Sequence, residues 1–308
     1  MQMTDKSKQR TSLKRKEEAK KQLFLYTMFS PFAILFLVFS VLPVLASVVL
    51  SFFSYDMLST PKFIGFDNYQ QMFLGDDVFP IAFKNTLLFA VVTGPIGFLL
   101  SFLLAWMINE FGPKPRSLLS FLFYSPALAG NTYFIWQVLF SGDRYGYINS
   151  FLLNLGVISS PIQWFKEETY AMPLVIIVQL WVSLGVSFLA NIAGLQNVNS
   201  EMYEAGAIDG IKNRWQEAWY ITLPSMKNIL LFSIVMQIQA SFSVSGIATA
   251  LTGFPSVNYS THTIVTHLTD VGTLRYELGY AAAISVFLFA LMAIVRVLLG
   301  KLVDMTGK

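Results

Sequence analysis

The chain of 308 residues contains no cysteine. A disulfide framework, a thiolate metal site and a cysteine nucleophile are therefore excluded. The chain also has little charge, because Asp, Glu, Lys and Arg make up only 13% of its residues while apolar residues make up 55%. In soluble domains about a quarter of the residues are charged, so this composition indicates a membrane protein.

The sequence also lacks the common catalytic motifs. It has no G-x-x-x-x-G-K-[ST] segment, so the chain does not bind ATP through a P-loop of its own. It has neither H-E-x-x-H nor G-x-S-x-G. We therefore expect no catalytic residue, no metal ligand and no cofactor bound directly by this chain. His262 and His267 stand five residues apart without obvious partners, and we interpret them as structural or solvated.

Six apolar runs dominate the rest of the chain, and each is near the roughly 20 residues that a membrane-spanning helix needs. No charged residue stands at their centres, where a charge costs about 2.5–3.5 kcal/mol, so an ion-coupled carrier finds no support. We predict an all-α integral membrane protein with six transmembrane helices. The runs cover residues 23–53, 81–108, 118–140, 173–195, 229–252 and 281–299.

The second and third runs contain Pro and Gly at positions that predict a kink or a break, namely Thr93–Gly97 and Ser125–Gly130. One interpretation is close helix packing through the small residues. The other is the wall or gate of a cavity, because backbone groups freed inside a membrane must be satisfied by protein or by water.

The basic residues predict the orientation. If the N-terminus is inside, the inner segments hold sixteen Lys and Arg and the outer segments hold five. Residues 1–22, with eight of them, are predicted to be a basic cytoplasmic tail against anionic lipid, and not a nucleic-acid arm, because no aromatic residues are interleaved. Residues 23–308 then form one six-span domain. Residues 54–80, 141–172 and 253–280 face outward.

The segment 201–224 joins the fourth and fifth runs on the inner side and is too polar to lie in lipid. The Asp209-Gly210 step predicts the end of a short helix, because Gly adopts positive φ without steric cost. Asn213 is predicted to cap a second short helix, with Gln216 as its capping-box partner. The segment is thus a helix–turn–helix, closed by Pro224, at the membrane surface.

This segment resembles the EAA loop of the membrane subunits of ABC importers, whose pattern is E-A-A, three residues, G, nine residues, I-x-L-P. The two departures are Gly206 in place of the second Ala, and ten residues instead of nine between Gly210 and Ile221, which leaves the register of the second helix open. The resemblance implies that the loop couples the chain to an ATPase. The residues that it implies for this role are Glu204, Ala205, Gly206, Asp209, Gly210, Ile221, Leu223 and Pro224.

Other segments resemble carbohydrate-importer permeases, and the Trp215-Gln216 pair is similar to the maltose F-type subunit. The resemblance implies the permease fold of a type I ABC importer in the bacterial cytoplasmic membrane, with both termini inside. It also implies the partners: a second homologous permease, two ATP-binding subunits that hold ATP and Mg, and an extracytoplasmic solute-binding protein. The matching residues are 63–69, 146–152 and Asn85-Thr86.

The fourth and fifth runs carry polar residues at every fourth position, which places them on one helix face. They are predicted to form either interhelical hydrogen bonds or a polar lining for an uncharged, hydroxyl-rich solute. In maltose-type permeases the helices on either side of the EAA loop contact the sugar. That resemblance implies Gln179, Ser183, Gln237 and Ser241 as substrate-binding residues.

The sequence therefore predicts the permease subunit of an ATP-driven importer for a sugar or oligosaccharide. One alternative is the import of glycerol 3-phosphate or another small solute by the same machinery, and an anion would require Arg or Lys on the cavity face. A second alternative is an ATP-independent secondary carrier, for which the 201–224 segment would be dispensable.

Overall fold

The structure, a computed structural model, describes the backbone of residues 3–306 and the side chains of residues 18 and 20–301. Most side chains of the predicted basic tail lie outside these ranges. The elements in chain order are α1 (Met3–Phe36), η1 (Leu37–Val41), α2 (Leu42–Leu50), β1 (Phe53–Ser54), β2 (Lys62–Phe63), α3 (Asp67–Gln70), η2 (Gln71–Gly75), α4 (Val78–Asn109), α5 (Pro113–Leu128), α6 (Phe134–Leu139), α7 (Tyr147–Asn154), α8 (Glu168–Val182), α9 (Val186–Gln196), α10 (Ser200–Ile208), α11 (Arg214–Glu217), η3 (Ala218–Thr222), α12 (Leu223–Ser225), α13 (Lys227–Phe242), α14 (Gly246–Thr252), η4 (Val257–Tyr259), α15 (Ile264–Thr269), η5 (Asp270–Leu274) and α16 (Leu278–Thr306).

Five stretches of the described chain are long and apolar enough to cross a membrane. They cover Lys20–Leu50, Val78–Asn109, Glu168–Gln196, Lys227–Thr252 and Leu278–Lys301. The predicted third span is different, because it is divided into α5 and α6 by the non-helical residues 129–133. The break predicted at Ser125–Gly130 is thus confirmed. Apart from the two-residue strands β1 and β2, the regular elements are helical, as predicted.

Of the outcomes predicted for Thr93–Gly97, a break is not found, whereas close helix packing through the small residues is. Helix α4 runs without interruption from Val78 to Asn109 with Pro95 inside it. The glycines serve close packing instead, because a β-carbon built on Gly97 would lie 2.1 Å from Gln237 Nε2 of α13. Small residues let two helix backbones approach closely in a membrane.

Helix α4 is the centre of the molecule, since α5, α8, α9, α13 and α15 all pack against it. One apolar cluster joins α4 with α15 and α16, a second joins it with α9 and α13, and a third joins it with α8 and α14. Buried hydrogen bonds run between the same helices, including Thr93 Oγ1 to Ser241 Oγ (3.0 Å) and Asn191 Nδ2 to Ser101 Oγ (3.3 Å).

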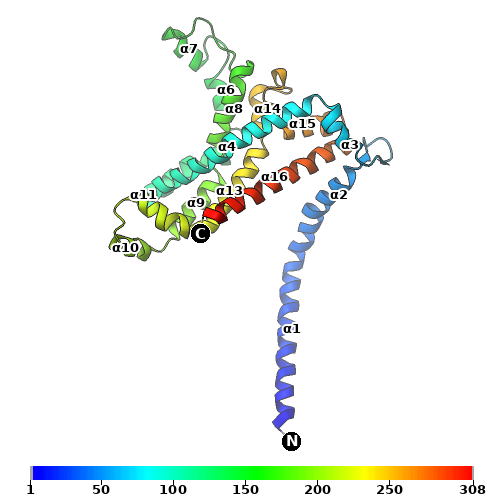
Figure 1. Cartoon of the computed structure of the whole chain (residues 1–308), viewed down its shortest axis with the longest axis vertical. Coiled ribbons are helices and arrows are strands. Elements are labelled where there is room, and N and C mark those ends of the chain that lie inside the picture. Colours follow the sequence, from blue (N-terminus) through cyan, green and yellow to red (C-terminus); the bar gives the residue numbers. More distant parts are fainter. Residues whose placement is uncertain (1–2, 307–308) are drawn as a thin grey trace.

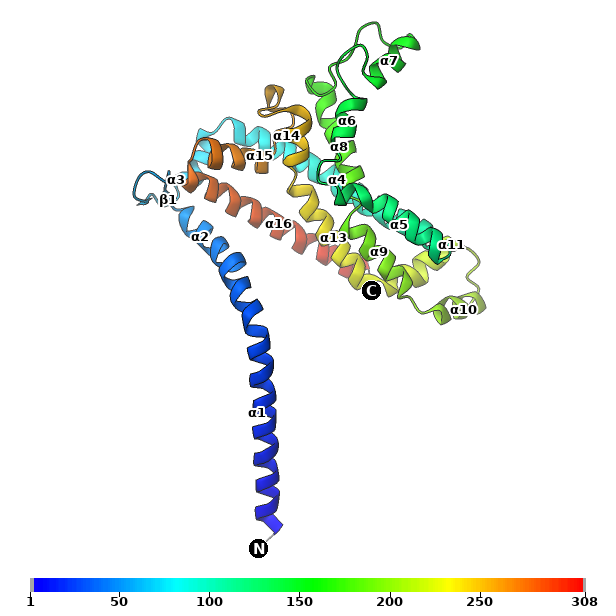
Figure 2. The same ribbon diagram turned by 180° about the vertical axis from the view of Figure 1, so that it is seen from behind.

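The first span stands apart from this body. Figures 1 and 2 show α1 running away from the other helices, while α2 packs against α16. None of the residues in the most apolar part of Lys20–Leu50 is buried within the described chain. A helix that is apolar all round is suited to a membrane, where lipid or another membrane subunit covers it.

Candidate functional site

The segment between α9 and α13 folds as the predicted helix–turn–helix. Helix α10 begins after Asn199, whose side-chain oxygen accepts the Glu201 N–H (3.1 Å). Helix α11 begins after Asn213, whose Oδ1 accepts the Gln216 N–H (2.9 Å). Gln216 Oε1 in turn accepts the N–H of Lys212 (2.9 Å). The predicted cap is confirmed, and Gln216 reaches back one residue further than in a standard capping box.

Gly210 ends the first helix, as predicted. Its φ of +94° lies in the region that suits glycine. The N–H of Ile211 donates to the Gly206 carbonyl (2.9 Å) and the N–H of Gly210 to the Ala207 carbonyl (3.4 Å). These two bonds form a Schellman motif, which closes the C-terminus of α10 and turns the chain toward α11.

Gly206, the departure from E-A-A, lies at the joint between the two arms. A β-carbon there would be 2.6 Å from Ile221 Cδ1 and 3.0 Å from Ile211 Cδ1. Ile221 is buried against it, so the I-x-L-P residues pack on the E-A-A residues. Gly206 and Ile221 therefore hold the loop together, whereas Glu204 is exposed and free to meet a partner.

The tenth residue between Gly210 and Ile221 is accommodated by a π-helical turn. Residues Ala218–Thr222 form η3, directly before Leu223 and Pro224 in α12. A π-turn contains one residue more than an α-turn, so an inserted residue bulges there and leaves the helix after it in register.

The loop is fastened to the bundle and presents apolar side chains outward. Arg214 bridges Glu110 after α4 (2.6 Å) and Glu217 (2.7 Å), and the Trp215 ring contacts the Trp106 ring with 5.0 Å between centroids. Ile208 is 87% exposed, the most of the large apolar side chains around Glu204. The other exposed ones in the loop are Met202, Trp215, Trp219 and Tyr220. Exposed apolar groups around a carboxylate are typical of a protein-binding surface.

The helices on both sides of this loop are themselves interrupted. Ser183–Gly185 separate α8 from α9, and Ser243–Ser245 separate α13 from α14. The end of α5 lies beside the first of these breaks, since a β-carbon on Gly185 would be 3.3 Å from Ala127 Cβ. Interrupted membrane helices are tolerated where the free backbone lines a cavity or contacts protein.

The four residues predicted to bind substrate all lie near these breaks, but in helix contacts. Gln237 is 2% exposed, and its Nε2 donates to the Thr93 carbonyl (3.2 Å). Ser241 accepts from Thr93, Gln179 Nε2 donates to the Ala240 carbonyl (3.4 Å), and Ser183 donates to the Leu180 carbonyl (3.0 Å). The contacts of Gln237, Ser241 and Gln179 match the interhelical alternative, whereas the bond of Ser183 stays within the end of α8. Gln237 and Ser241 are buried in this conformation, and Gln237 Oε1 has no partner among the described residues.

The cavity beside Gln237 and Ser241 is unsuited to a sugar. It lies between α4, α13 and α16, has a volume of about 380 Å³, and is otherwise lined by apolar residues and glycine, such as Val91, Phe98 and Val295. By contrast, Gln239 of α13, Ser243 in the break after α13 and Gly246 at the start of α14 are exposed. Gln239 lies two positions from the buried Gln237, so it is on the opposite side of α13.

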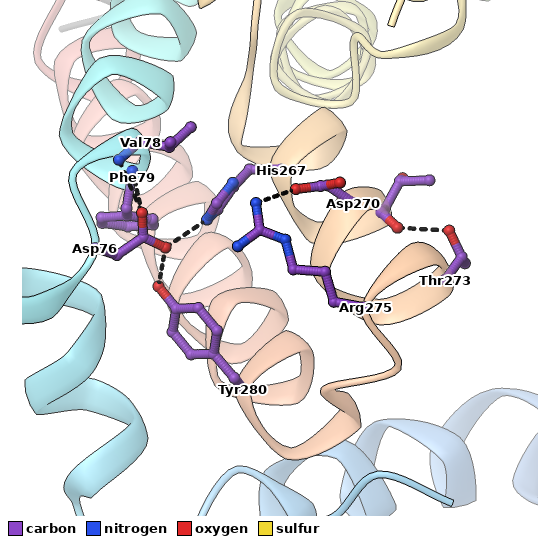
Figure 3. Close-up of polar contacts among 9 residues, drawn as sticks. Asp76, Val78, Phe79, His267, Asp270, Thr273, Arg275 and Tyr280 are labelled. Atoms are coloured by element: carbon purple, nitrogen blue, oxygen red, sulfur yellow. Dashed lines mark hydrogen bonds and ion pairs between the residues drawn. The ribbon is translucent and has the colours of Figure 1, made fainter. Parts of the chain in front are cut away.

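The histidines are buried, so of the two predicted interpretations the structural one holds and the solvated one is wrong, and His267 has a partner that the sequence did not reveal. His267 Nε2 lies 2.8 Å from Asp76 Oδ2, which also accepts from Tyr280 Oη at 2.7 Å (Figure 3). Asp76 Oδ1 accepts the N–H groups of Val78 and Phe79. Burial raises the pKa of Asp76, but the hydrogen bonds from Tyr280 and Phe79 and the electrostatic interaction with His267 outweigh it and hold the pKa below its usual value. Asp76 and His267 are 191 residues apart, so no sequence pattern pairs them.

No protein-family model matches the chain. Among curated proteins it is similar to the probable ABC transporter permease protein YesP of Bacillus subtilis, with 31% identity over 90% of this chain and 89% of that one. It is 30% identical to the arabinooligosaccharides transport system permease protein AraP of the same organism, over 90% and 87%. It is also 30% identical to the lactose transport system permease protein LacF of Rhizobium radiobacter, over 94% and 95%.

Two solved structures have the same fold. One is a bacterial ABC transporter that imports the polysaccharide alginate, with a TM-score of 0.77 and 22% identity over 95% of this chain and 99% of that chain. The other is a bacterial alginate ABC transporter in complex with an alginate pentasaccharide-bound periplasmic protein, with a TM-score of 0.78 and 23% identity over 95% and 98%.

Proposed function

The chain belongs to the permease subunits of bacterial ABC importers, and from this premise we propose that it carries a sugar or oligosaccharide inward across the cytoplasmic membrane. The observation that carries the substrate class is the chemistry of the three helix breaks. Residues 129–133, 183–185 and 243–245 include no Lys, Arg, Asp or Glu but contain hydroxyl and amide groups. Such a lining favours a neutral solute over glycerol 3-phosphate.

In this proposal a permease subunit is the membrane component of the transporter, and ATP and Mg are held by two partner ATPase subunits. The α10–α11 loop is their docking element on the cytoplasmic side. Glu204 meets the ATPase directly, and Ala205, Asp209, Gly210, Leu223 and Pro224 shape the loop around it. Gly206 and Ile221 keep its two arms closed, and the Arg214 bridge transmits its displacement to the end of α4.

The proposed assembly has a second homologous permease beside this one, with both termini cytoplasmic. The exposed first span supports this, because it extends away from its own bundle and offers apolar surface to another membrane subunit. In this proposal the divided pair α5 and α6 forms the third span in chain order, which brings the number of spans to six. Residues 1–22 are the cytoplasmic tail, and the outer segments receive solute from an extracytoplasmic binding protein.

The proposed sugar path runs along the exposed polar side of α13 and the neighbouring breaks. Gln239 and Ser243 line it in the conformation described here. Gln179 and Ser183 lie at the adjoining break, and Gln237 and Ser241 connect α13 to α4 behind it. A path of neutral donors and acceptors binds hydroxyl groups without trapping the solute.

Uptake of radiolabelled oligosaccharides by cells lacking this chain, complemented with variants, tests the proposal. Wild-type uptake should be abolished by vanadate and ATP depletion and be insensitive to a protonophore. Glu204→Lys should reduce uptake at least tenfold while the complex still assembles. Glu201→Lys is the matched control, because it makes the same charge change on the same exposed helix. Protonophore-sensitive, vanadate-resistant uptake would establish a secondary carrier instead.

A further inference from the structure

Asp76 joins three distant parts of the chain at the predicted outer end of the bundle. It lies in the turn before α4, His267 belongs to α15, and Tyr280 belongs to the first turn of α16. The His267 side chain is fully buried, and that of Asp76 is 11% exposed. Figure 3 shows the His267 and Tyr280 side chains converging on the Asp76 carboxylate, which with the two backbone N–H groups receives four hydrogen bonds in all.

The segment that contains His267, residues 256–277, is fastened to α4 by further contacts. Asn85 Nδ2 donates to the carbonyls of Tyr259 (2.9 Å) and His262 (3.0 Å). The N–H of Ile264 donates to Thr86 Oγ1 (2.8 Å). Ile264 and Val271 are completely buried, so the segment is packed against the bundle at both residues.

Within this unit the unpaired buried nitrogens among the described residues are Nδ1 of His267 and both ring nitrogens of His262, and only His262 lacks a partner altogether. Its side chain is 1% exposed and neither ring nitrogen has a hydrogen-bond partner among the described residues. Its ring centroid is 5.6 Å from that of His267. The other titratable or charged groups around it are Asp76 before α4, Asp270 of η5, Arg275 and Tyr259, and none of them bonds to its ring, while α4 contributes the neutral Asn85.

We propose that residues 256–277 form a latch on the outer end of the permease, meaning a segment that is closed at neutral pH and opens on acidification. The Asp76 junction holds the latch closed, and protonation of His262 opens it. With neutral His262 the segment stays closed, because the imidazole is then a buried ring among other rings. A protonated His262 has two N–H donors and a charge but no acceptor in the closed segment. Protonation is therefore accommodated only when the segment opens and the ring meets water.

The sign and size of the effect follow from the two states. Burial, and then the nearby His267, lower the pKa of His262 to about 4 in the closed segment. A solvated imidazole has a pKa of about 6.5. Between these values only the open state takes up the proton, so acidification favours opening. Relative to pH 7.5, the opening equilibrium rises about tenfold at pH 5.5 and about twenty-five-fold at pH 5. Asp76 stays ionised throughout this window, because its pKa is lowered.

Thiol labelling of the full chain in intact cells tests the latch, since the native chain has no cysteine. Thr261→Cys reports opening, because this side chain is 2% exposed. Val257→Cys is the control in the same segment, where the side chain is 46% exposed. The ratio of their labelling rates with an impermeant maleimide cancels the pH dependence of the reagent. The ratio should rise about tenfold from pH 7.5 to pH 5.5.

Three further variants make the test decisive. His262→Leu should remove the pH dependence of the labelling ratio. Asp76→Asn should raise this ratio at pH 7.5, because it weakens the junction that holds the latch closed. Val271→Cys is a second, apolar reporter that decides the matter if Thr261→Cys is labelled as fast as the control at pH 7.5. A ratio that stays flat with both reporters, or an equal rise in the His262→Leu background, would overturn the proposal.

Discussion

Gly97→Ala tests the hypothesis that Gln237 packs α13 against α4. The added methyl carbon would lie 2.1 Å from Gln237 Nε2, about 1.3 Å inside ordinary contact at 3.4 Å. Ser183 Oγ, at 3.2 Å, limits any movement toward α8. Gln237 must therefore leave its position and give up its bond to the Thr93 carbonyl.

The cost is the sum of opposing terms. Overpacking of a tight site costs about 1–3 kcal/mol. Loss of a buried hydrogen bond costs about 1 kcal/mol more. The gain in helix propensity from Gly to Ala returns at most about 1 kcal/mol. We expect a net destabilisation of about 1–3 kcal/mol. Gly300→Ala is the control, because Gly300 is also helical in a span but has no neighbour within 4 Å.

A double-mutant cycle measured by thermal unfolding of the purified complex in nanodiscs separates packing from solute binding. Gln237→Ala removes the group that the methyl added by Gly97→Ala would strike, so the double variant should be about as stable as Gln237→Ala alone. The coupling should then be about 2 kcal/mol. Strict additivity, or a Gly97→Ala variant as stable as the wild type, would refute the packing argument.

Three other outcomes are expected. Gln239→Leu should reduce uptake about five- to a hundredfold with assembly intact, since an unpaired sugar hydroxyl costs about 1–3 kcal/mol; unchanged uptake would place the path elsewhere. An impermeant thiol reagent should label Leu58→Cys, whose side chain is 94% exposed, in intact cells but not Lys114→Cys, and the reverse would invert the orientation. Gly210→Ala should weaken the loop by about 1 kcal/mol through its φ of +94°, seen as reduced ATPase stimulation, which an intact response would contradict.

The local features of this protein were predictable from its sequence. Five of the six apolar runs correspond to stretches long and apolar enough to cross a membrane, because a span depends on length and hydrophobicity, whereas the third run is divided into α5 and α6. The Asn213 cap and the Gly210 turn were predictable too, because capping and positive φ are decided within a few residues. The local pattern of residues 204–224 also indicated the family of ABC importer permeases, and the similarity to known permeases confirms that family.

Only the tertiary structure decided which residues meet across the chain. Thr93–Gly97 has the composition of a helix break, but α13 packs on it and α4 continues, since packing supplies what the Gly and Pro residues lose in propensity. The fourfold spacing of Gln237 and Ser241 predicted a shared face but not that this face meets α4, leaving Gln239 and Ser243 open. Asp76 finds His267 and Tyr280 across 191 and 204 residues. A contact of that kind exists only once the helices between have packed, and no local pattern encodes it.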